Sequence, residues 1–567
     1  MERPWLKFYE TAVNQSPAIP EKTIYDLFED AVRLSPKQPA LFFFGRKFSY
    51  AELARMIDAC AAALAGIGVR SGDRVAIILP NLPQFVVAHY AIMKIGAVVV
   101  PTNPLYVERE LEHQLNDGGA EVAIALDLLH KRIEAVRGKT RLRAVIYTGV
   151  QDYLPALLRV LYPLKAKREG RWVSTPSDNG VYRFVNLMKQ TFPPIHKKEM
   201  QPQDVAMLLY TGGTTGVAKG AVLTHRNLVA NVAQLQAWCY GAEIGREVLL
   251  SVLPFFHSYG LTTCLHFSLI IRCALVLIPR FDIEMILKAI DKYKVTLFPG
   301  VPTMYVAVNN YPQIKKYDLK KIKLCISGAA PLPLEVAKKF EEITAGGRLV
   351  EGYGLSECSP VTHANPIFGE RREGSIGLPM PLTDARIVDP ETGETLAAGR
   401  VGELTVRGPQ VMQGYWQMPA ETAKVLQDGW LFTGDMARMD QDGYFYIVDR
   451  KKDMIIAGGF NIYPREIEEV LFKHPKVLEA AVIGVKDRYR GETVKAFVVL
   501  REGALASEEE LVAFCKKEMA AFKVPKLVEF RKELPKTLIG KVLRRALAEE
   551  EKSKTVKVAS TAATEVN

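Results

Sequence analysis

The sequence predicts an α/β protein with a large N-terminal domain of parallel sheets covered by helices, a small β-rich region within it, and a smaller α+β C-terminal domain. Three observations lead to this prediction. Apolar runs of strand length alternate with amphipathic helical patterns from Tyr25 to about Ile326, which is typical of helix-covered parallel sheets. Short strands punctuated by Gly and Pro fill 374–446, and a compact mixture of helices and strands fills 450–545. A chain of 567 residues is also too long for one compact domain.

The N-terminal alternation assigns strands and helices in pairs. Each apolar run has the length of a buried strand, and each segment after it repeats apolar residues at helical spacing. The expected strands and following helices are 74–79 and 84–94, 97–100 and 108–116, 274–278 and 283–293, and 295–298 and 302–308. The run 205–209 predicts one more buried strand, and a helical pattern begins at about Asn227. Because ligands bind at the carboxyl ends of strands in such folds, the loops there are candidate sites.

The second half of the chain changes character at Gly374. The segment 402–408 is typical of a short strand, and we expect a small β-barrel or sheet over about 374–446. Beyond it, the pattern predicts helices at 466–473 and 508–518 and strands at 480–485 and 496–500. The predicted domains are residues 1–449 and 450–548, followed by a tail of residues 549–567 whose small polar side chains predict disorder.

Composition is that of an ordinary globular protein, with 48% hydrophobic and 24% charged residues. The formal net charge of +11 favours anionic partners, but no zinc finger, recognition-helix motif or arginine-rich run points to nucleic acid. The seven cysteines form no CxxC pair, which predicts buried free thiols in a reducing compartment. The first residues lack the apolar core of a signal peptide, and no stretch of about 18 uncharged apolar residues occurs. We therefore expect a cytoplasmic protein.

A leucine-rich run at 151–172 stands out from this composition. Its leucines precede a basic end and Trp172, an arrangement typical of a segment at a membrane interface. Pro155 and Pro163 argue against one long helix, and a surface excursion between two strands is the alternative. The run therefore leaves open a peripheral contact with the inner face of the membrane.

The most informative motif lies between Tyr210 and Gly220, directly after the predicted strand 205–209. Its glycines let backbone N–H groups approach a phosphate closely, its threonines add hydroxyls, and Lys219 adds a cation. The spacing is not that of a Walker A loop, in which Lys directly follows the second Gly and precedes Ser or Thr. The motif thus predicts phosphate binding without predicting a P-loop ATPase.

Four later motifs narrow this prediction. In chain order they are 351–357 (Glu-Gly-Tyr-Gly-Leu-Ser-Glu), 429–435 (Gly-Trp-Leu-Phe-Thr-Gly-Asp), 449–466, which begins Asp-Arg-Lys-Lys-Asp, and 535–545, which contains Gly-Lys at 540–541. With the glycine-rich loop they resemble, in order, the core motifs of the adenylate-forming acyl-CoA synthetase family over about residues 25–547. The loop itself is most similar to that of bacterial long-chain fatty acid:CoA ligases. The resemblance implies ATP-dependent activation of a medium- to long-chain fatty acid to acyl-AMP, and then transfer to coenzyme A.

The resemblance also implies roles for individual residues. Lys541 is the expected main catalytic cation, with Lys219 and His257 as further catalytic residues. Thr211 and Glu357 are expected to hold Mg²⁺, which prefers oxygen ligands. Tyr353 would stack on adenine, while Asp435 and Arg450 would bind the ribose hydroxyls. The other residues expected around ATP or AMP are Gly212, Gly213, Thr214, Thr215, Gly216, Gly328, Ala329, Glu351, Gly352, Gly354, Ser356 and Ile447.

Two positions depart from common patterns of the family. Ser356 stands where Thr is usual, a change that keeps the hydroxyl. His257 stands where amino-acid-activating relatives generally carry Asp, so the resemblance argues against an amino acid substrate. The expected acyl pocket is apolar, and each buried CH₂ of a long chain would contribute about 0.8 kcal/mol. Its expected lining is Phe256, Tyr259, Phe298, Gly300 and Met304.

Two half-reactions require two arrangements of one site, because a sealed ATP site does not admit a thiol. The resemblance implies that the C-terminal domain is mobile and rotates about a hinge at Lys452. Rotation would withdraw Lys541 and bring Gly458 and Gly459, which leave room for the pantetheine arm, to the acyl adenylate. The expected partners are thus ATP, Mg²⁺, coenzyme A and a fatty acid, and a homodimer stays open.

Three alternatives also stay open. An aryl acid:CoA ligase would share the mechanism. An adenylating enzyme that loads a carrier protein would share the first half-reaction, although no carrier domain follows in this sequence. A catalytically inactive binding protein is the third, and the presence of Glu357, Asp435 and Lys541 argues against it.

Overall fold

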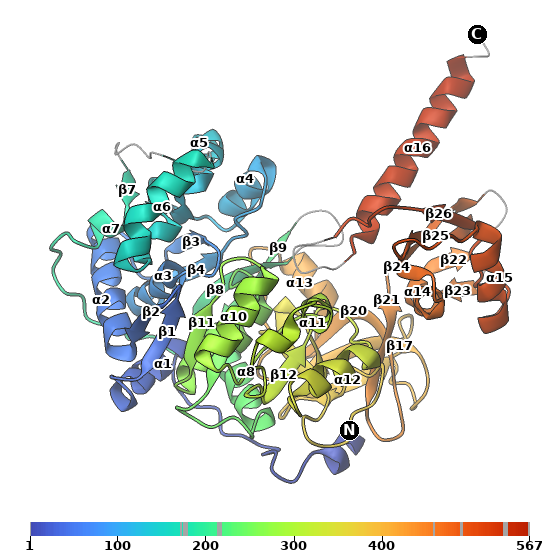
Figure 1. Cartoon of the computed structure of the whole chain (residues 1–567), viewed down its shortest axis with the longest axis horizontal. Helices are drawn as coiled ribbons and strands as arrows, with labels where there is room; N and C mark the ends of the chain where they lie inside the picture. The colour runs from blue at the N-terminus through green and yellow to red at the C-terminus, as the bar shows by residue number, and fades with distance from the viewer. Residues whose placement is uncertain are drawn as a thin grey trace. The chain divides into compact units, whose positions relative to one another are not determined.

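The computed structural model describes residues 2–169, 173, 180–211, 218–457, 460–487, 491–536 and 542–564 (Figure 1). Contacts between Cα atoms divide the chain into two compact units. Unit 1 consists of Met1–Asp384 and Arg407–Leu431, and unit 2 of Ala385–Val406 and Phe432–Asn567. Much of the β-rich region therefore groups with the C-terminal part of the chain, whereas the sequence places the domain boundary at residue 449.

The largest sheet of unit 1 confirms the predicted parallel architecture. Its order is β18-β9-β8-β4-β3-β5-β6-β7 within the described residues, and the strands from β8 to β7 run parallel. The antiparallel strands β9 and β18 extend it at one side. Its strands are β3 (Arg74–Ile78), β4 (Val98–Pro101), β5 (Val122–Leu126), β6 (Ala144–Thr148), β7 (Val181–Arg183), β8 (Val205–Thr211), β9 (Lys219–Thr224) and β18 (Gly414–Tyr415).

Helices cover this sheet, as a parallel topology requires. The helix α3 (Pro83–Ile95) packs on β3 and β4 and is buried on nearly every side, which explains its almost continuous apolar sequence. It also packs against α2 (Tyr50–Gly66), which a capping box of Ser49 and Glu52 begins. The other helices of this region are α1 (Ile24–Leu34), α4 (Glu108–Asp117), α5 (His130–Arg137) and α8 (His225–Trp238).

Two smaller sheets complete the described part of unit 1, in the orders β10-β11-β1-β2 and β12-β13-β14-β15. Their strands are β1 (Pro39–Phe43), β2 (Arg46–Ser49), β10 (Val248–Ser251), β11 (Ala274–Leu277), β12 (Leu324–Ser327), β13 (Arg348–Gly354), β14 (Val361–Ala364) and β15 (Leu378–Pro379). The helices α10 (Ile283–Tyr293) and α11 (Pro302–Asn309) match prediction closely. The predicted strand 295–298 does not form a ladder. Only Leu297 bridges, to Leu249 and Leu324, because Pro299 and the start of α11 follow at once.

The β-rich region and the C-terminal domain follow the predicted order of elements. A sheet in the order β16-β17-β20-β19, with β21 beside β20, contains β16 (Asp384–Val388), β17 (Gly402–Arg407), β19 (Leu426–Gln427), β20 (Trp430–Met439) and β21 (Phe445–Arg450). A second sheet contains β22 (Ile455–Ala457), β23 (Phe460–Ile462), β24 (Val477–Asp487), β25 (Gly491–Leu500) and β26 (Leu527–Phe530).

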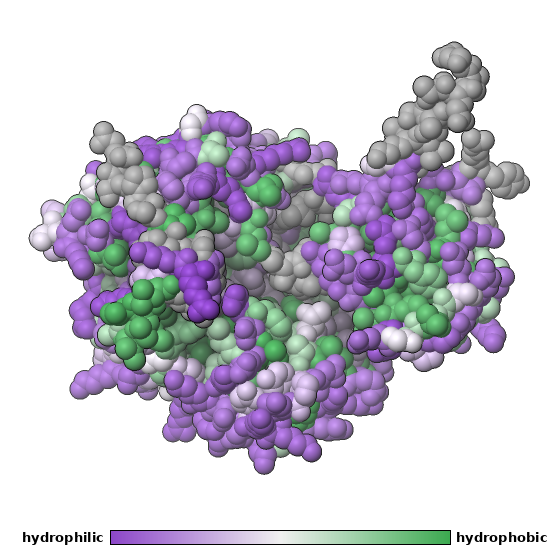
Figure 2. Space-filling model, turned by 45° about the horizontal axis from the view of Figure 1, so that its top comes forward, coloured by the Kyte–Doolittle hydropathy of each residue, from purple (hydrophilic) through white to green (hydrophobic). Residues whose placement is uncertain are grey.

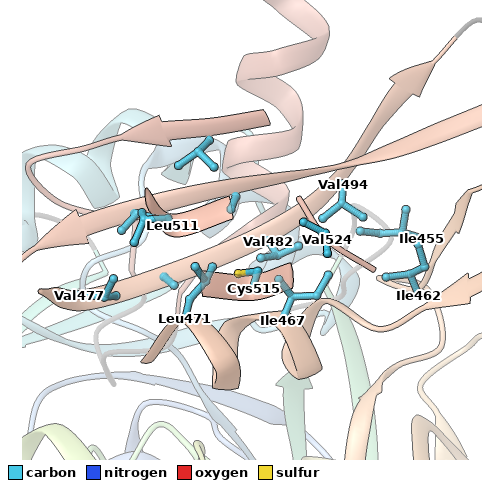
Figure 3. Close-up of a cluster of buried hydrophobic side chains, with 14 of the residues drawn as sticks. Ile455, Ile462, Ile467, Leu471, Val477, Val482, Val494, Leu511, Cys515 and Val524 are labelled. Carbon is cyan, nitrogen blue, oxygen red and sulfur yellow. The ribbon is translucent and has the colours of Figure 1, made fainter. Parts of the chain in front are cut away.

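The second sheet of unit 2 has a core on each face. On one face, Val482 and Val494 pack with residues of α14 (Pro464–Lys473) and α15 (Glu508–Glu518), as Figure 3 shows for Ile467, Leu471 and Leu511. On the other face, the alternate residues of β24 and β25 pack against Leu534 and Leu547. Successive strand residues point to opposite faces, so one strand pair supplies both cores.

The C-terminal helix α16 (Arg544–Thr564) differs from the disordered tail predicted from residue 549. Its sequence is rich in Ala, Glu and Lys, which favour helix, and contains no Gly or Pro. Ion pairs also hold its first turns to the sheet, between Glu551 and Lys495 at 2.8 Å and between Glu550 and Arg531 at 2.8 Å.

The leucine-rich run forms η3 (Val150–Tyr153) and α6 (Ala156–Arg168). Pro155 precedes α6, as is common at a helix start, and the helix continues through Pro163, contrary to the break expected there. All seven cysteines are buried and free, as predicted. Within the described ranges, none of the helices combines the length and hydrophobicity needed to cross a membrane.

Candidate active site

The phosphate-binding motif is built on a hairpin of β8 and β9. Thr211 is the last residue of β8 and pairs with Lys219, the first residue of β9. The sequence predicts that a helix follows the loop directly. The structure places β9 before α8, because Ala221, Val222 and Leu223 are buried in a strand that pairs with β8. The predicted residues Gly212, Gly213, Thr214, Thr215 and Gly216 lie outside the described residues.

Lys219, Tyr415 and Glu357 form a polar network in unit 1. Lys219 Nζ forms an ion pair with Glu421 in α13 (Pro419–Val425) and lies 5.2 Å from the centre of the Tyr415 ring. Tyr415 Oη donates a 2.8 Å hydrogen bond to Glu357 Oε1. Hydrogen bonds from Lys219 and Lys424 lower the pKa of the Glu421 carboxyl to about 2. The ion pair therefore persists throughout the neutral pH range.

Glu357 and Thr211, the two expected Mg²⁺ ligands, come from adjoining elements. Glu357 lies in η6 (Ser356–Cys358), which packs against β8 and β9. A carboxylate and a hydroxyl suit a hard cation that completes its shell with phosphate and water oxygens. No group of three His, Cys, Asp or Glu side chains that could hold a metal occurs in the described part of the chain. Thr211 and Glu357 supply two oxygen donors, so a Mg²⁺ ion held by them would take its remaining ligands from phosphate and water.

The segments expected to hold adenine leave two neighbouring parallel strands, β12 and β13. Gly328 follows β12, and its N–H donates to the carbonyl of Gly300 at 3.1 Å. A Cβ atom at Gly328 would lie only 2.9 Å from the Tyr259 ring, so a larger residue would displace that ring. Ala329 adopts the left-handed conformation at φ +67°, which turns the chain sharply after the strand.

Glu351, at the end of the parallel part of β13, fixes the loop that follows Ala329. Its Oε2 atom accepts a 2.9 Å hydrogen bond from the N–H of Leu332. This buried carboxylate therefore ties the two segments expected to bind adenine to each other.

Tyr353 lies between two glycines that neighbouring atoms require. A Cβ atom at Gly354 would lie 2.0 Å from the Pro360 carbonyl oxygen, and one at Gly352 would lie 2.8 Å from a methyl group of Ile326. The Tyr353 ring meets His363 edge to face, with centroids 5.9 Å apart. Burial lowers the pKa of His363 to about 3, so this imidazole is neutral at pH 7.

Ser356 and His257 belong to segments that meet in the structure. Ser356 Oγ lies 3.2 Å from Ser258 Oγ, within hydrogen-bond distance. The neighbouring His257 keeps part of its surface exposed, but desolvation lowers its pKa to about 4. A neutral imidazole can offer one donor and one acceptor at pH 7 but no positive charge.

Four of the five residues expected around the acyl chain gather at the ends of β12 and of the segment that contains Leu297. Tyr259 Oη donates to the Ile326 carbonyl at 2.7 Å, and Gly300 bridges to Ser327. Met304 is buried on α11. Phe298 is fully buried, and its ring lies 5.4 Å from the Tyr305 ring and 6.4 Å from the Phe340 ring. Phe256, the fifth, lies beside His257 with ring centroids 4.8 Å apart.

The expected ribose-binding pair lies in unit 2. Asp435 on β20 faces Arg450 on β21 in the strand register, and Arg450 Nε lies 2.6 Å from Asp435 Oδ1. Ile447 is on the same strand as Arg450, opposite Ala437. The Asp435 side chain is almost fully buried, so the pair presents one partly exposed guanidinium beside a buried carboxyl group.

The expected hinge follows β21 directly. Lys452 is exposed and lies within a turn that is closed by a 3.0 Å hydrogen bond from the Asp453 N–H to the Arg450 carbonyl. Arg544 contacts Asp453 at 3.3 Å, Asp449 at 3.1 Å and Glu468 at 2.5 Å. The expected catalytic Lys541 and the expected CoA-binding residues Gly458 and Gly459 lie outside the described residues.

Several residues of the site were not predicted from the sequence. Tyr415 and Glu421 lie outside every motif used above, and only contacts across the sheet relate them to Lys219. Ser258 directly follows His257, and Arg544 lies in the motif 535–545, three residues after Lys541. Their polar side chains were the available signal.

Comparison with known proteins agrees with this site. The profile of the AMP-binding enzyme family matches residues 28–416, and that of the AMP-binding enzyme C-terminal domain matches residues 466–541. The chain is 49% identical over 556 residues to a long-chain-fatty-acid--CoA ligase of Bacillus subtilis (strain 168), covering 97% of this chain and 98% of that protein. A ligase of the same name from Escherichia coli O157:H7 is 42% identical over 561 residues, covering 98% and 99%.

Solved structures show the same similarity in three dimensions. ATP-bound MatB from Rhodopseudomonas palustris has a TM-score of 0.81 at 31% identity, covering 93% of this chain and 99% of that one. Because both profiles match in order and the similarity covers nearly the whole length, the chain belongs to the AMP-binding enzyme family.

Proposed function

We propose that this chain is an AMP-forming long-chain fatty acid:CoA ligase, which activates a fatty acid with ATP and transfers it to coenzyme A. The observation that carries this proposal is the 49% identity, over nearly the full length of both chains, to a long-chain-fatty-acid--CoA ligase. Two arrangements in unit 1 support it: Gly328 follows β12 while Tyr353 lies on the neighbouring strand β13, and Thr211 ends β8, which packs against the η6 turn that contains Glu357.

Adenylation replaces oxide, a poor leaving group, by AMP. In the proposed first step, a carboxylate oxygen of the fatty acid attacks the α-phosphorus of ATP, the bond to the β-phosphate oxygen breaks, and pyrophosphate leaves. Thr211 and Glu357 would hold Mg²⁺, which neutralises phosphate charge when bound. Lys541 supplies the cation beside the carboxylate and α-phosphate oxygens, and Asp435 and Arg450 hold the ribose.

Thioester formation follows at the same acyl adenylate. The thiol sulfur of coenzyme A attacks the acyl carbon, the bond to the AMP oxygen breaks, and the thiol proton passes to solvent or a base. We propose that rotation about Lys452 exchanges Lys541 for Gly458 and Gly459 between the two steps. The neutral His257 suits an uncharged acyl chain better than a substrate amine, which needs an anionic partner.

Substrate profiling tests the reaction and the acyl class together. Pyrophosphate release is measured with ATP, Mg²⁺ and coenzyme A, across saturated acids of increasing length and two aryl acids. We expect kcat/KM to rise about fourfold for each added CH₂ until the pocket is filled. Higher kcat/KM for aryl acids would favour the aryl acid ligase, and release that does not depend on coenzyme A would favour a carrier-loading enzyme.

The role of Lys541 separates the two half-reactions. Lys541→Ala removes the cation needed for adenylation, so we expect pyrophosphate release to fall at least about a hundredfold. Thioester formation from preformed acyl-AMP should change less than about threefold, because Lys541 is withdrawn in that step. Equal loss in both half-reactions would contradict this assignment.

A further inference from the structure

The helix α6 presents its apolar side to water. Leu157, Val160, Leu161 and Leu164 follow the spacing i, i+3, i+4 and i+7, which places them on one face of the helix. Their exposed fractions are 72%, 70%, 48% and 70%. Ala166, on the opposite face, is buried. In a helix that packs on its own domain, the apolar stripe faces the core. In α6 the apolar stripe faces solvent instead.

This stripe is the centre of a larger apolar surface. Leu158, beside it, is 42% exposed. Figure 2 shows hydrophobic side chains gathered at the left of the molecule, where α6 lies in Figure 1, with strongly hydrophilic side chains next to them. Exposed apolar patches on this scale mark interaction sites far more often than single exposed leucines do.

The charges on the helix itself are of one sign, and one acidic residue, Glu169, follows directly after its last residue. The sequence of α6 contains Arg159, Lys165, Lys167 and Arg168 and no acidic residue. Arg168 and Lys167 are exposed at the carboxyl end of the helix, where the stripe ends. Leucine side chains flanked by basic residues match the two components of an anionic bilayer surface, its acyl region and its negatively charged headgroups.

The helix is anchored to unit 1 at its start. Leu154 is buried directly before it, and Tyr153 packs against Phe48 and Phe184, with ring centroids 6.1 Å and 6.4 Å away. The apolar stripe is therefore held at a fixed place on a folded unit.

We propose that the exposed face of α6 is a docking surface for an anionic lipid bilayer, with Leu157, Val160, Leu161 and Leu164 entering the interface and Lys167 and Arg168 facing the headgroups. Such docking would place an enzyme for a membrane-partitioning fatty acid beside its substrate. That consequence depends on the proposed function. Binding to the bilayer depends only on the exposed residues of α6.

Flotation with extruded vesicles tests the proposal on the full chain, without ATP, coenzyme A or fatty acid. We expect the protein to bind vesicles that contain phosphatidylglycerol and to bind pure phosphatidylcholine vesicles severalfold more weakly. The variant L157S/V160S/L164S should lower the partition coefficient for the anionic vesicles at least about tenfold, because it removes most of the inserted apolar surface. K167Q/R168Q should lower it severalfold and remove most of its dependence on salt.

A matched variant controls for the loss of exposed apolar residues in general. Ile244, Leu478 and Leu505 are 47%, 48% and 86% exposed and lie away from α6 in the sequence, so I244S/L478S/L505S should bind within twofold of the parent. Both serine variants should keep parental activity on a short soluble acid, which shows that they are folded.

Two results would overturn the proposal. One is parental binding to anionic vesicles by L157S/V160S/L164S. The other is a dimer of the parent in light scattering that this variant abolishes, which would assign the face to a second copy of the chain. If the parent lacked ligase activity but bound the vesicles as described, the proposed function would fail and the docking surface would stand.

Discussion

Tyr415 holds one carboxylate oxygen of Glu357, which is an expected Mg²⁺ ligand. Its hydroxyl donates to Glu357 Oε1 at 2.8 Å, and its ring lies beside the ammonium group of Lys219. A hydrogen bond to a charged group contributes about 1.5–3 kcal/mol, so its loss should be measurable. We therefore propose that Tyr415 acts by positioning the Glu357 carboxylate.

We expect Tyr415→Phe to raise the Mg²⁺ concentration for half-maximal activity about tenfold. The maximal rate at saturating Mg²⁺ should change less than threefold, because the carboxylate remains present. The measurement is pyrophosphate release titrated with Mg²⁺ at fixed ATP. Tyr446→Phe removes the same kind of contact, to Asp440 in unit 2, and should leave the titration unchanged. A lower maximal rate with an unchanged Mg²⁺ dependence would count against the positioning role.

Glycine positions show what the sequence could and could not predict at this scale. The motif placed Gly352 and Gly354 around Tyr353, and packing against Ile326 and the Pro360 carbonyl explains why both are glycine. The partner of Tyr353, His363, could not be predicted, because it comes from the next strand of an antiparallel pair. Contacts across a sheet depend on register, which a motif within one segment does not specify.

At the scale of elements, Arg544 ties the start of α16 to the expected hinge segment. It contacts Asp449, Asp453 and Glu468, and the side chains of Asp449 and Glu468 are almost fully buried. Burial raises the pKa of the Glu468 and Asp449 carboxyls, while the Arg544 guanidinium opposes that rise. Removing one partner of a buried ion pair leaves uncompensated charge and costs about 3–5 kcal/mol.

We expect Arg544→Gln to destabilise unit 2 by about 3 kcal/mol at pH 7.5 and by less at pH 5.5. The sign follows from the raised pKa of the buried carboxyls, because a lower pH protonates them and relieves the repulsion that the variant creates. Hydrogen exchange of peptides from β24 and β25 in the full chain measures this local stability.

The adjacent residue offers a matched control. Arg545 is half exposed and pairs with Glu549, one turn along α16. Arg545→Gln should therefore change the free energy of local opening, obtained from the exchange rates, by less than about 1 kcal/mol. Similar effects of the two substitutions would show that the contacts of Arg544 with the three carboxylates do not stabilise unit 2.

Element boundaries were predicted where one physical signal dominates. The helices 283–293 and 508–518 match prediction residue for residue, because each has a capping residue directly before its periodic segment. The strand β9 was not predicted, because only three consecutive aliphatic residues, Ala221, Val222 and Leu223, lie between the glycine-rich loop and Thr224. The continuation of α6 through Pro163 was also missed, since local preference predicts a break there.

At the scale of the molecule, the alternation of strands and helices was sufficient to predict a parallel α/β unit followed by a smaller unit. It was not sufficient to predict that 385–406 and 432–449 group with the C-terminal residues, because the contacts responsible join segments far apart in the sequence. The resemblance supplied the family, and neither composition nor charge would have done so.

Unit 1 also contains a set of buried histidines that the proposed chemistry does not use. His89 Nε2 lies 2.8 Å from His266 Nε2, and both side chains are fully buried. Burial lowers the pKa of His225 to about 4 and those of His266 and His363 to about 3, and it holds the pKa of His89 well below its usual range. Each of these imidazoles is therefore neutral in the folded protein near pH 6. In the unfolded chain the same imidazoles bind protons at that pH.

This difference predicts that acid destabilises unit 1 well above the range in which carboxylates titrate. Because the folded-state pKa values are depressed, no cost arises above about pH 6.5, and stability falls as the pH drops from there towards pH 4. At pH 5 each buried histidine costs about 2 kcal/mol, from roughly 1.5 pH units at 1.36 kcal/mol each. We expect the melting temperature of the full chain to be flat from pH 8 to pH 7 and to fall steeply from pH 6.5 to pH 5.

Replacing one such histidine by a neutral residue, as in His225→Gln or His266→Gln, should lower the number of protons taken up on unfolding by about one. The melting temperature should then fall less steeply between pH 6.5 and pH 5. His196→Gln, at an exposed position, should leave the slope as it is. The measurement is calorimetry at matched ionic strength, and the slope is compared within each variant so that a change in melting temperature at pH 8 does not enter. Identical slopes for all three variants would mean that these histidines open to solvent before the unit unfolds, and the predicted acid sensitivity of the core would be wrong.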